Sequence, residues 1–231
     1  MYNTIEVENF DLSIKELIGG SMKVIAINGS PKKEGNTYHA LKLVANKLEE
    51  ENIEVEIVHI GNKVIRGCAA CNQCAKNRDE KCIFDDEVNS TLQLMKDADG
   101  ILLGSPTHYA AIGGTMKSFL DRLFYVAGNN NSMLRGKVGA AVVAVRRSGG
   151  IPTFTQLNNF LNYSEMVMPT SNYWNVIHGT RPGEVLEDAE GVQIMEVLGK
   201  NMATLLKQME VTKEISDENT MVRKTFTNFI R

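Results

Sequence analysis

Short β-rich runs alternate with segments of helical periodicity along most of this 231-residue chain. The runs predict buried strands, and the apolar residues spaced three or four apart after each run predict an amphipathic helix. Strands that alternate with helices form a parallel sheet covered by helices on both faces. We therefore expect an α/β protein with three αβα layers and a doubly wound, five-stranded parallel sheet in the order 2-1-3-4-5. The expected strands are 23–28, 54–59, 101–104, 138–145 and 166–169, and the expected helices lie near 41–48, 88–95, 114–125, 153–163 and 190–209.

The loop after the first strand has the residue types of an anion site. Residues 29–37 read Gly-Ser-Pro-Lys-Lys-Glu-Gly-Asn-Thr, in which the glycines allow a tight turn and Ser, Asn and Thr supply donors at the start of a helix. The loop lacks the G-x-x-x-x-G-K-[ST] of nucleoside-triphosphate sites and the G-x-G-x-x-G of dinucleotide sites. The phosphate of flavin mononucleotide (FMN) fits it better than either ligand. The alternative is a turn in which Asn36 or Thr37 only caps the helix.

All four cysteines lie within fifteen residues, at Cys68, Cys71, Cys74 and Cys82. Four thiolates this close in sequence are typical of a shared iron–sulfur cluster or metal ion. The C-x2-C-x2-C spacing resembles the start of a bacterial ferredoxin motif, although Ile83 rather than proline follows the fourth cysteine. Two alternatives stay open: a zinc ion, whose cysteine pairs are usually well separated, and free thiols that cycle with disulfides.

Charge and hydropathy exclude several classes of protein. A formal net charge of −3 and a pI near 5.9 give no electrostatic reason to bind nucleic acid or an anionic membrane. The longest apolar runs are strand-sized, so we expect no transmembrane helix. Residues 1–21 lack the basic start and apolar stretch of a signal peptide. We therefore expect a cytoplasmic protein, in which cysteines serve metal binding or redox chemistry rather than structural disulfides.

Three motifs together resemble those of a known family. They are G-S-P-x-x-x-G-N-T after the first strand, the cysteine motif after the second, and G-S-P-T-H-Y (104–109) after the third. From about Met22 to Met209 the chain resembles the flavodoxin-like NADPH-dependent FMN reductases and, among them, the iron–sulfur flavoproteins with their C-x2-C-x2-C-x4–7-C spacing. The resemblance implies an FMN-binding domain over 22–210 with a cysteine-rich insertion at 66–84, extensions at 1–21 and 211–231, and a homodimer or homotetramer.

The flavin ring is expected at two strand ends. By similarity to the family it lies against the loop after the third strand, and the Arg-Gly-Gly end of the fourth strand suits the negative charge of a reduced ring. The alternatives are that Tyr109 packs at a helix–loop junction, that His108 is solvated and that the arginine is an ordinary surface cation. A polar-aromatic segment around Trp174 is expected to cover the flavin, the nicotinamide pocket or a subunit contact, or to anchor a loop. The expected contacts are Ser30, Lys33, Asn36 and Thr37 for the phosphate and Pro106, Thr107, His108, Tyr109, Arg146, Gly149 and Gly150 for the ring.

These features predict an FMN-dependent oxidoreductase of the NAD(P)H-dependent flavin or quinone reductase type. Its cofactors would be FMN and a [4Fe–4S] cluster on the four cysteines, with NAD(P)H as co-substrate and a small molecule or ferredoxin as the electron partner. We expect no catalytic side chain, because hydride transfer to a flavin requires no general base. The alternative is a non-enzymatic electron carrier that shuttles between ferredoxin-like proteins.

Overall fold

The computed structural model describes residues 21–212 together with residues 225 and 227. Residues 20–206 form one compact unit, which contains the sheet and both candidate sites discussed below. Of the second unit, residues 1–19 and 207–231, only 207–212, 225 and 227 are described. The extensions expected at 1–21 and 211–231 therefore lie almost wholly outside the described residues.

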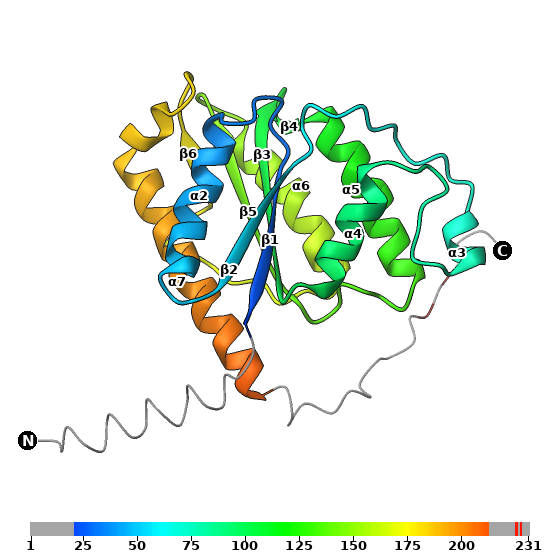
Figure 1. The fold of residues 1–231 in the computed structure, drawn as a ribbon. Coiled ribbons are helices and arrows are strands. Elements are labelled where there is room, and N and C mark those ends of the chain that lie inside the picture. The colour runs from blue at the N-terminus through cyan, green and yellow to red at the C-terminus, as the bar shows by residue number, and fades with distance from the viewer. Residues whose placement is uncertain (1–20, 213–224, 226, 228–231) are drawn as a thin grey trace, which may run out of the picture. The chain divides into compact units, whose positions relative to one another are not determined.

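The sheet has the predicted order. Its five parallel strands run β2-β1-β3-β5-β6, which is 2-1-3-4-5 when the parallel strands alone are numbered along the chain. A two-residue strand, β4, pairs antiparallel with the end of β3. In Figure 1, β1 rises to the loop that leads into the first helix, so the carboxyl ends of the strands lie at the upper edge. The strands are β1 Lys23–Asn28, β2 Glu54–His59, β3 Gly100–His108, β4 Ala111–Ile112, β5 Val138–Val145 and β6 Val176–His178.

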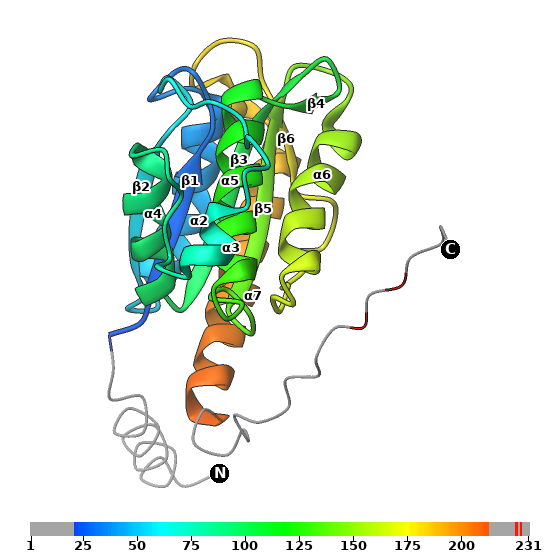
Figure 2. The same ribbon diagram turned by 90° about the vertical axis from the view of Figure 1, so that its right-hand side faces the viewer.

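Helices cover both faces of the sheet. Figures 1 and 2 show α2 and α7 on one face and α4, α5 and α6 on the other, while the short α3 lies out beside α5. A 3-10 turn, η1, connects β6 to α7. The helices are α2 Asn36–Glu49, α3 Gln73–Asn77, α4 Glu87–Asp97, α5 Gly114–Asn129, α6 Gly150–Tyr163 and α7 Ala189–Thr212, and η1 is Glu184–Glu187. Among the described residues, no helix combines the length and the apolar character needed to cross a membrane.

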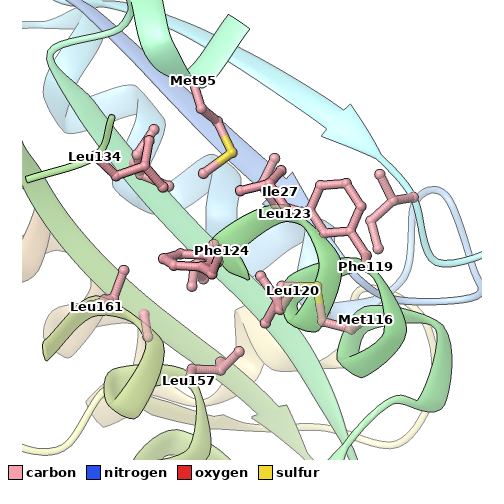
Figure 3. Packing of buried hydrophobic residues seen from close by; sticks show 14 of the residues in the cluster. Ile27, Met95, Met116, Phe119, Leu120, Leu123, Phe124, Leu134, Leu157 and Leu161 are labelled. Atoms are coloured by element: carbon pink, nitrogen blue, oxygen red, sulfur yellow. The ribbon is translucent and has the colours of Figure 1, made fainter. Parts of the chain in front are cut away.

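The main core lies between the sheet and the α4, α5 and α6 face. Ile27 of β1 packs among Met95 of α4 and Phe119, Leu123 and Phe124 of α5 (Figure 3). Burying each such side chain stabilises the fold by about 1.5–3 kcal/mol. Because β1, β3 and β5 are buried on both faces, their sequences are apolar without alternation, and this made them recognisable.

The fifth strand was predicted in the wrong place. It is β6, Val176–His178, whereas in 166–169 only Val167 forms an isolated bridge, with Val138. Met166 instead packs under the sheet, where its Cε would lie 2.9 Å from a Cβ added to Gly139. The last strand of the sheet lies instead just after Trp174. Asn175, the residue before this strand, holds it against β5 by donating a hydrogen bond from Nδ2 to the Ala141 carbonyl (3.0 Å). A run of three strand residues is too short for sequence periodicity to reveal.

The third strand is longer than predicted. It continues from Gly104 to His108, because Ser105 and Pro106 still pair with β5, and Thr107 and His108 pair with β4. Part of the segment expected as a loop after this strand is therefore held in the sheet.

Candidate functional site

The loop between β1 and α2 is folded by its own side chains. Asn28, buried at the end of β1, donates from Nδ2 to the Lys33 carbonyl (2.9 Å) and accepts from the backbone N–H of Ser30 (3.0 Å). Ser30 Oγ accepts from the N–H of Lys32 (3.2 Å). Gly35 is the N-cap of α2 in an extended conformation, without a side-chain cap in the described part. The expectation that Asn36 or Thr37 only caps the helix is therefore wrong.

Three polar atoms around this loop are buried and have no hydrogen-bond partner within the described residues. They are Oδ1 of Asn36, Oγ1 of Thr37 and Oγ1 of Thr107, at the start of α2 and at the end of the adjacent strand β3. An unsatisfied buried polar group costs about 1–3 kcal/mol, so such groups call for a ligand or an ordered water. The first N–H groups of α2 also lack intrahelical partners. The hydroxyl of Thr37 and these N–H groups can donate to a phosphate bound at the N-terminus of α2, whereas Asn36 Oδ1 can only accept, as it would from a hydroxyl group of the ligand.

The loop after β2 supports the phosphate loop from behind. His59 Nε2 lies 2.7 Å from the Ser30 carbonyl oxygen, and the N–H of Gly61 donates to the Asn28 carbonyl (3.2 Å). A Cβ on Gly61 would lie 2.1 Å from the Ser30 oxygen and 2.5 Å from the Gly29 oxygen. We did not predict His59 or Gly61 from sequence. The sequence signal that could have identified them is their position at, and just after, the end of β2, a strand adjacent to β1.

We expect Gly61→Ala to weaken FMN binding at least tenfold while leaving the sheet folded. The added methyl group must displace the backbone of the phosphate loop, because the Ser30 carbonyl cannot rotate away as a flexible side chain could. Fluorescence titration of the apoprotein with FMN measures the affinity, and far-UV circular dichroism checks the fold. Gly128→Ala is the control, since a Cβ there meets nothing within 4 Å. Equal affinities in the two variants would contradict the supporting role of Gly61.

A strained hairpin stands where the ring was expected. Tyr109 and Ala110 connect β3 to β4 with φ of 50° and 58°, a two-residue turn that normally contains glycine or asparagine. Such left-handed residues cost about 1–3 kcal/mol each and occur most often at functional sites. Tyr109 is fully exposed, so the alternative that it packs at a helix–loop junction is wrong, and its expected contact with the ring stays a prediction. His108 is also exposed, whereas Pro106 and Thr107 are half-buried.

The loop after β5 meets this hairpin. Gly149 has φ of 88°, and a Cβ there would lie 3.0 Å from Ala110 Cα and 3.1 Å from Thr107 Cγ2. Gly149 is also the N-cap of α6. The phosphate loop is joined to the same region, since the N–H of Gly29 donates to the Gly104 carbonyl (2.9 Å). The structure thus places the loops after β1, β3 and β5 side by side, whereas Lys33 and Arg146 at their outer ends are exposed.

A cavity of about 300 Å³ opens beside the Gly149 loop. Its walls come from the loop after β5, from both ends of β6 and from the start of α7, and include Tyr173, Trp174 and His178. Tyr173 and Trp174 form an edge-on ring pair with centroids 4.6 Å apart, and both are more than half exposed. Burial would raise the pKa of Asp188, but hydrogen bonds from the N–H groups of Gly191 and His178 outweigh it and hold that pKa below its ordinary value.

The four cysteines line a single small pocket against α5. Cys74 is buried in α3, Cys82 is half-buried, and Cys68 and Cys71 are exposed. Burial raises the pKa of Cys74, a backbone hydrogen bond at Ala75 opposes this, and charge on Cys82 and Cys71 raises it further. Within the described residues, no three His, Cys, Asp or Glu side chains are grouped to hold a single metal ion. The fit to a cluster therefore rests on the shared pocket and on thiols that face it from two sides.

Buried or half-buried polar side chains from α4, from α5 and from the C-cap of α5 hold the segment that contains the four cysteines. Asn89 accepts from the Cys82 N–H (2.8 Å) and donates to the Cys82 carbonyl (3.0 Å). Asn130 donates to the Cys74 carbonyl (3.4 Å) and accepts from the N–H of Glu80 (3.0 Å). Arg122 Nε donates to Cys82 Sγ (3.4 Å). We did not predict these three residues, although Arg122 interrupts an apolar helix face between Phe119 and Val126.

Comparisons with known proteins agree with this geometry. The family model described as NADPH-dependent FMN reductase matches residues 22–181. An iron–sulfur flavoprotein of Methanocaldococcus jannaschii is 36% identical over 193 residues, which cover 80% of this chain and 98% of the relative. Another, from Archaeoglobus fulgidus, is 33% identical over 172 residues, which cover 74% and 83%. Among solved structures, an archaeal flavodoxin is similar with a TM-score of 0.54 at 20% identity, covering 80% of this chain and 99% of its own.

The family model covers well over half of the chain, and the first of these relatives exceeds 30% identity over nearly its full length. The order of the parallel strands is the one that the alternation of strands and helices predicted, and it is compatible with a flavodoxin-like fold. The chain therefore belongs to the NADPH-dependent FMN reductase family, in its iron–sulfur flavoprotein branch, and is an FMN-dependent oxidoreductase.

Proposed function

We propose that the protein oxidises NAD(P)H by means of FMN bound at the carboxyl edge of the sheet and passes the electrons to a small-molecule acceptor. The observation that carries the proposal is the set of buried polar atoms without partners in the described residues, on Asn36, Thr37 and Thr107. They lie where three loops of a doubly wound sheet converge, which is where this fold binds ligands.

Each loop has a separate task in this proposal. Ser30, Lys33, Asn36 and Thr37 bind the phosphate, with the N-terminal amides of α2 adding a favourable dipole. Gly149 and Gly150 leave no side chain between their backbone and the ring. A Cβ on either residue would also collide with neighbouring side chains or backbone. Pro106, Thr107, His108 and Tyr109, which lie beside Gly149, contact the ring as well, and Arg146 offsets negative charge on the ring.

When bound, FMN accepts two electrons as a hydride or one at a time, so it can join a two-electron donor to a one-electron centre. The protein then has two remaining tasks, which are to exclude water and to orient the nicotinamide against the ring. Tyr109 is exposed within one of the proposed ring loops, and the aromatic pair Tyr173–Trp174 lines the same cavity as Gly149 and Gly150. We propose that they contribute to the nicotinamide or acceptor side of the site.

We further propose that Cys68, Cys71, Cys74 and Cys82 ligate a [4Fe–4S] cluster. Support comes from the pocket that all four line, from backbone and guanidinium N–H groups directed at two of the sulfurs, and from relatives that are named iron–sulfur flavoproteins. Hydrogen bonds to sulfur are typical of cluster ligands. We also propose a cytoplasmic protein that assembles as a homodimer or homotetramer.

The test is anaerobic purification followed by absorption spectroscopy, iron and sulfide analysis, and turnover assays. We expect bound FMN, cluster iron, and oxidation of NADPH or NADH with free flavin, quinone or ferricyanide as acceptor. Yellow protein without iron would remove the cluster and leave the flavin, and colourless protein containing zinc would contradict both cofactors. Failure to oxidise either nucleotide, with rapid reduction by ferredoxin, would favour an electron carrier.

A further inference from the structure

Arg122 is the largest of the fully buried side chains in the described part of the chain. It projects from the middle of α5 into the wall of the cysteine pocket. Its Nη2 donates to the carbonyl of Phe84 (3.0 Å), and both Nη atoms donate to the carboxylate of Asp86. Its Nε donates to Cys82 Sγ at 3.4 Å. The guanidinium is thus a buried cation that bridges a carboxylate and a cysteine sulfur.

Stability alone gives little reason for this arrangement. Removing an arginine and a carboxylate from water costs several kcal/mol per ion, and apolar side chains of similar volume often serve a core as well or better. The neighbours of Arg122 on the inward face of α5 are Phe119, Leu123 and Val126, which show that an apolar residue would suit the helix. The charge at this position therefore calls for a functional reason.

The geometry points to Arg122 as a positioning residue that directs Cys82 and, together with Asp86, sets the reduction potential of the proposed cluster. This inference rests on the proposed [4Fe–4S] site. Net charge, hydrogen bonds to sulfur and solvent exposure tune the potential of such a cluster. A positive charge next to a ligand sulfur stabilises the reduced, more negative state. Because the pair is buried, neither salt nor water screens it strongly.

Asp86 makes the inference sharply testable, because it offsets the charge of Arg122. Arg122→Gln leaves an uncompensated carboxylate near the sulfur and makes the site more negative by one charge. Asp86→Asn leaves an uncompensated guanidinium and makes it more positive by one charge. The asparagine can still accept from the N–H of Val88, which Asp86 does now as the N-cap of α4 (3.2 Å). The two variants should therefore shift the potential in opposite directions, which a packing defect would not do.

The experiment is a redox titration of the anaerobically purified protein, with the cluster followed by electron paramagnetic resonance and iron counted per chain. We expect Arg122→Gln to lower the potential and Asp86→Asn to raise it. Each shift should correspond to at least a tenfold change in the one-electron reduction constant, which is 59 mV. Arg122→Lys, which keeps the charge but not the forked donors, should recover part of the shift.

Matched controls come from the exposed ion pair Lys117–Asp121 on the same helix. Lys117→Gln and Asp121→Asn make the same charge changes in water-exposed positions, and we expect shifts below half of those at the buried pair. If Arg122→Gln fails to fold, Asp86→Asn still decides the result against its control. Potentials that do not move while iron stays complete, or that move in the same direction in both variants, would overturn the role of Arg122 alone. Absence of iron from the wild type would overturn the proposed cluster and this role together.

Discussion

Replacing Asn36 and Thr37 together by alanine should lower FMN affinity at least thirtyfold in a protein that stays folded. Thr37 Oγ1 is buried and unpartnered within the described residues at the N-terminus of α2 and can donate to the phosphate, while the Asn36 amide can donate from its Nδ2. Each donor lost from a buried anion costs about 1–3 kcal/mol, and 1.4 kcal/mol corresponds to a tenfold change in affinity. Neither side chain caps α2, so the helix itself should lose little stability. Titration of the apoprotein with FMN, followed by quenching of flavin fluorescence, measures the effect.

Asn46→Ala is the matched control, since Asn46 is exposed near the other end of the same helix. It should bind FMN as the wild type does. Unchanged affinity in the folded double variant would mean that the phosphate is held elsewhere, and the assignment of the loop would then be wrong.

Substituting Cys74 by alanine should remove the iron of the whole cluster and leave FMN bound. Cys74 is the most buried of the four cysteines. Its replacement by alanine removes the sulfur ligand with little change in side-chain volume. The cysteine pocket is lined by the segment 68–72, by α3, by the loop at 82–84 and by the second half of α5, none of which is part of the phosphate loop. Iron and sulfide analysis, with the flavin absorbance as internal reference, gives both quantities in one preparation.

Cys74→Ser separates ligation from packing, because the hydroxyl keeps nearly the shape of the thiol, although it is more polar, and is a poor ligand for iron. It should behave as Cys74→Ala does. Ser118→Ala, in α5 beside Gly67 at the start of the cysteine segment, is the control and should keep its iron. Retention of full iron in both Cys74 variants would refute the four-cysteine site, and loss of FMN together with iron would show that the two sites are not independent.

Much of the fold could be predicted because strand and helix patterns are local. The apolar runs of β1, β3 and β5 show burial on both faces, and their alternation with helices leaves few arrangements of a parallel sheet. The position of the fifth strand could not be predicted in this way. Val176–His178 is short, and what makes it a strand is pairing with Val143 to Val145, far away in the sequence. The run at 166–169 was the better local pattern and the wrong one.

The candidate sites, too, could be predicted only in part. The motif at 29–37 and the four cysteines were visible in the sequence because their chemistry lies in adjacent residues. The supports behind them were not visible. Gly61, in the loop after β2, packs against the carbonyl of Ser30. Arg122 contacts Cys82 although the two residues are forty positions apart in the sequence.

The sequence by itself determined the type of sheet, and it predicted an anion loop at the edge of that sheet and a cysteine-based site, since each depends on short-range periodicity or on clustered residue types. Only the tertiary structure decided which polar atoms are buried without partners in the described residues, and only it placed Arg122, paired with Asp86, in the wall of the cysteine pocket. The physical reason is that burial and electrostatic coupling are properties of distance in space. They arise when strands and helices pack, and no spacing along the chain records them.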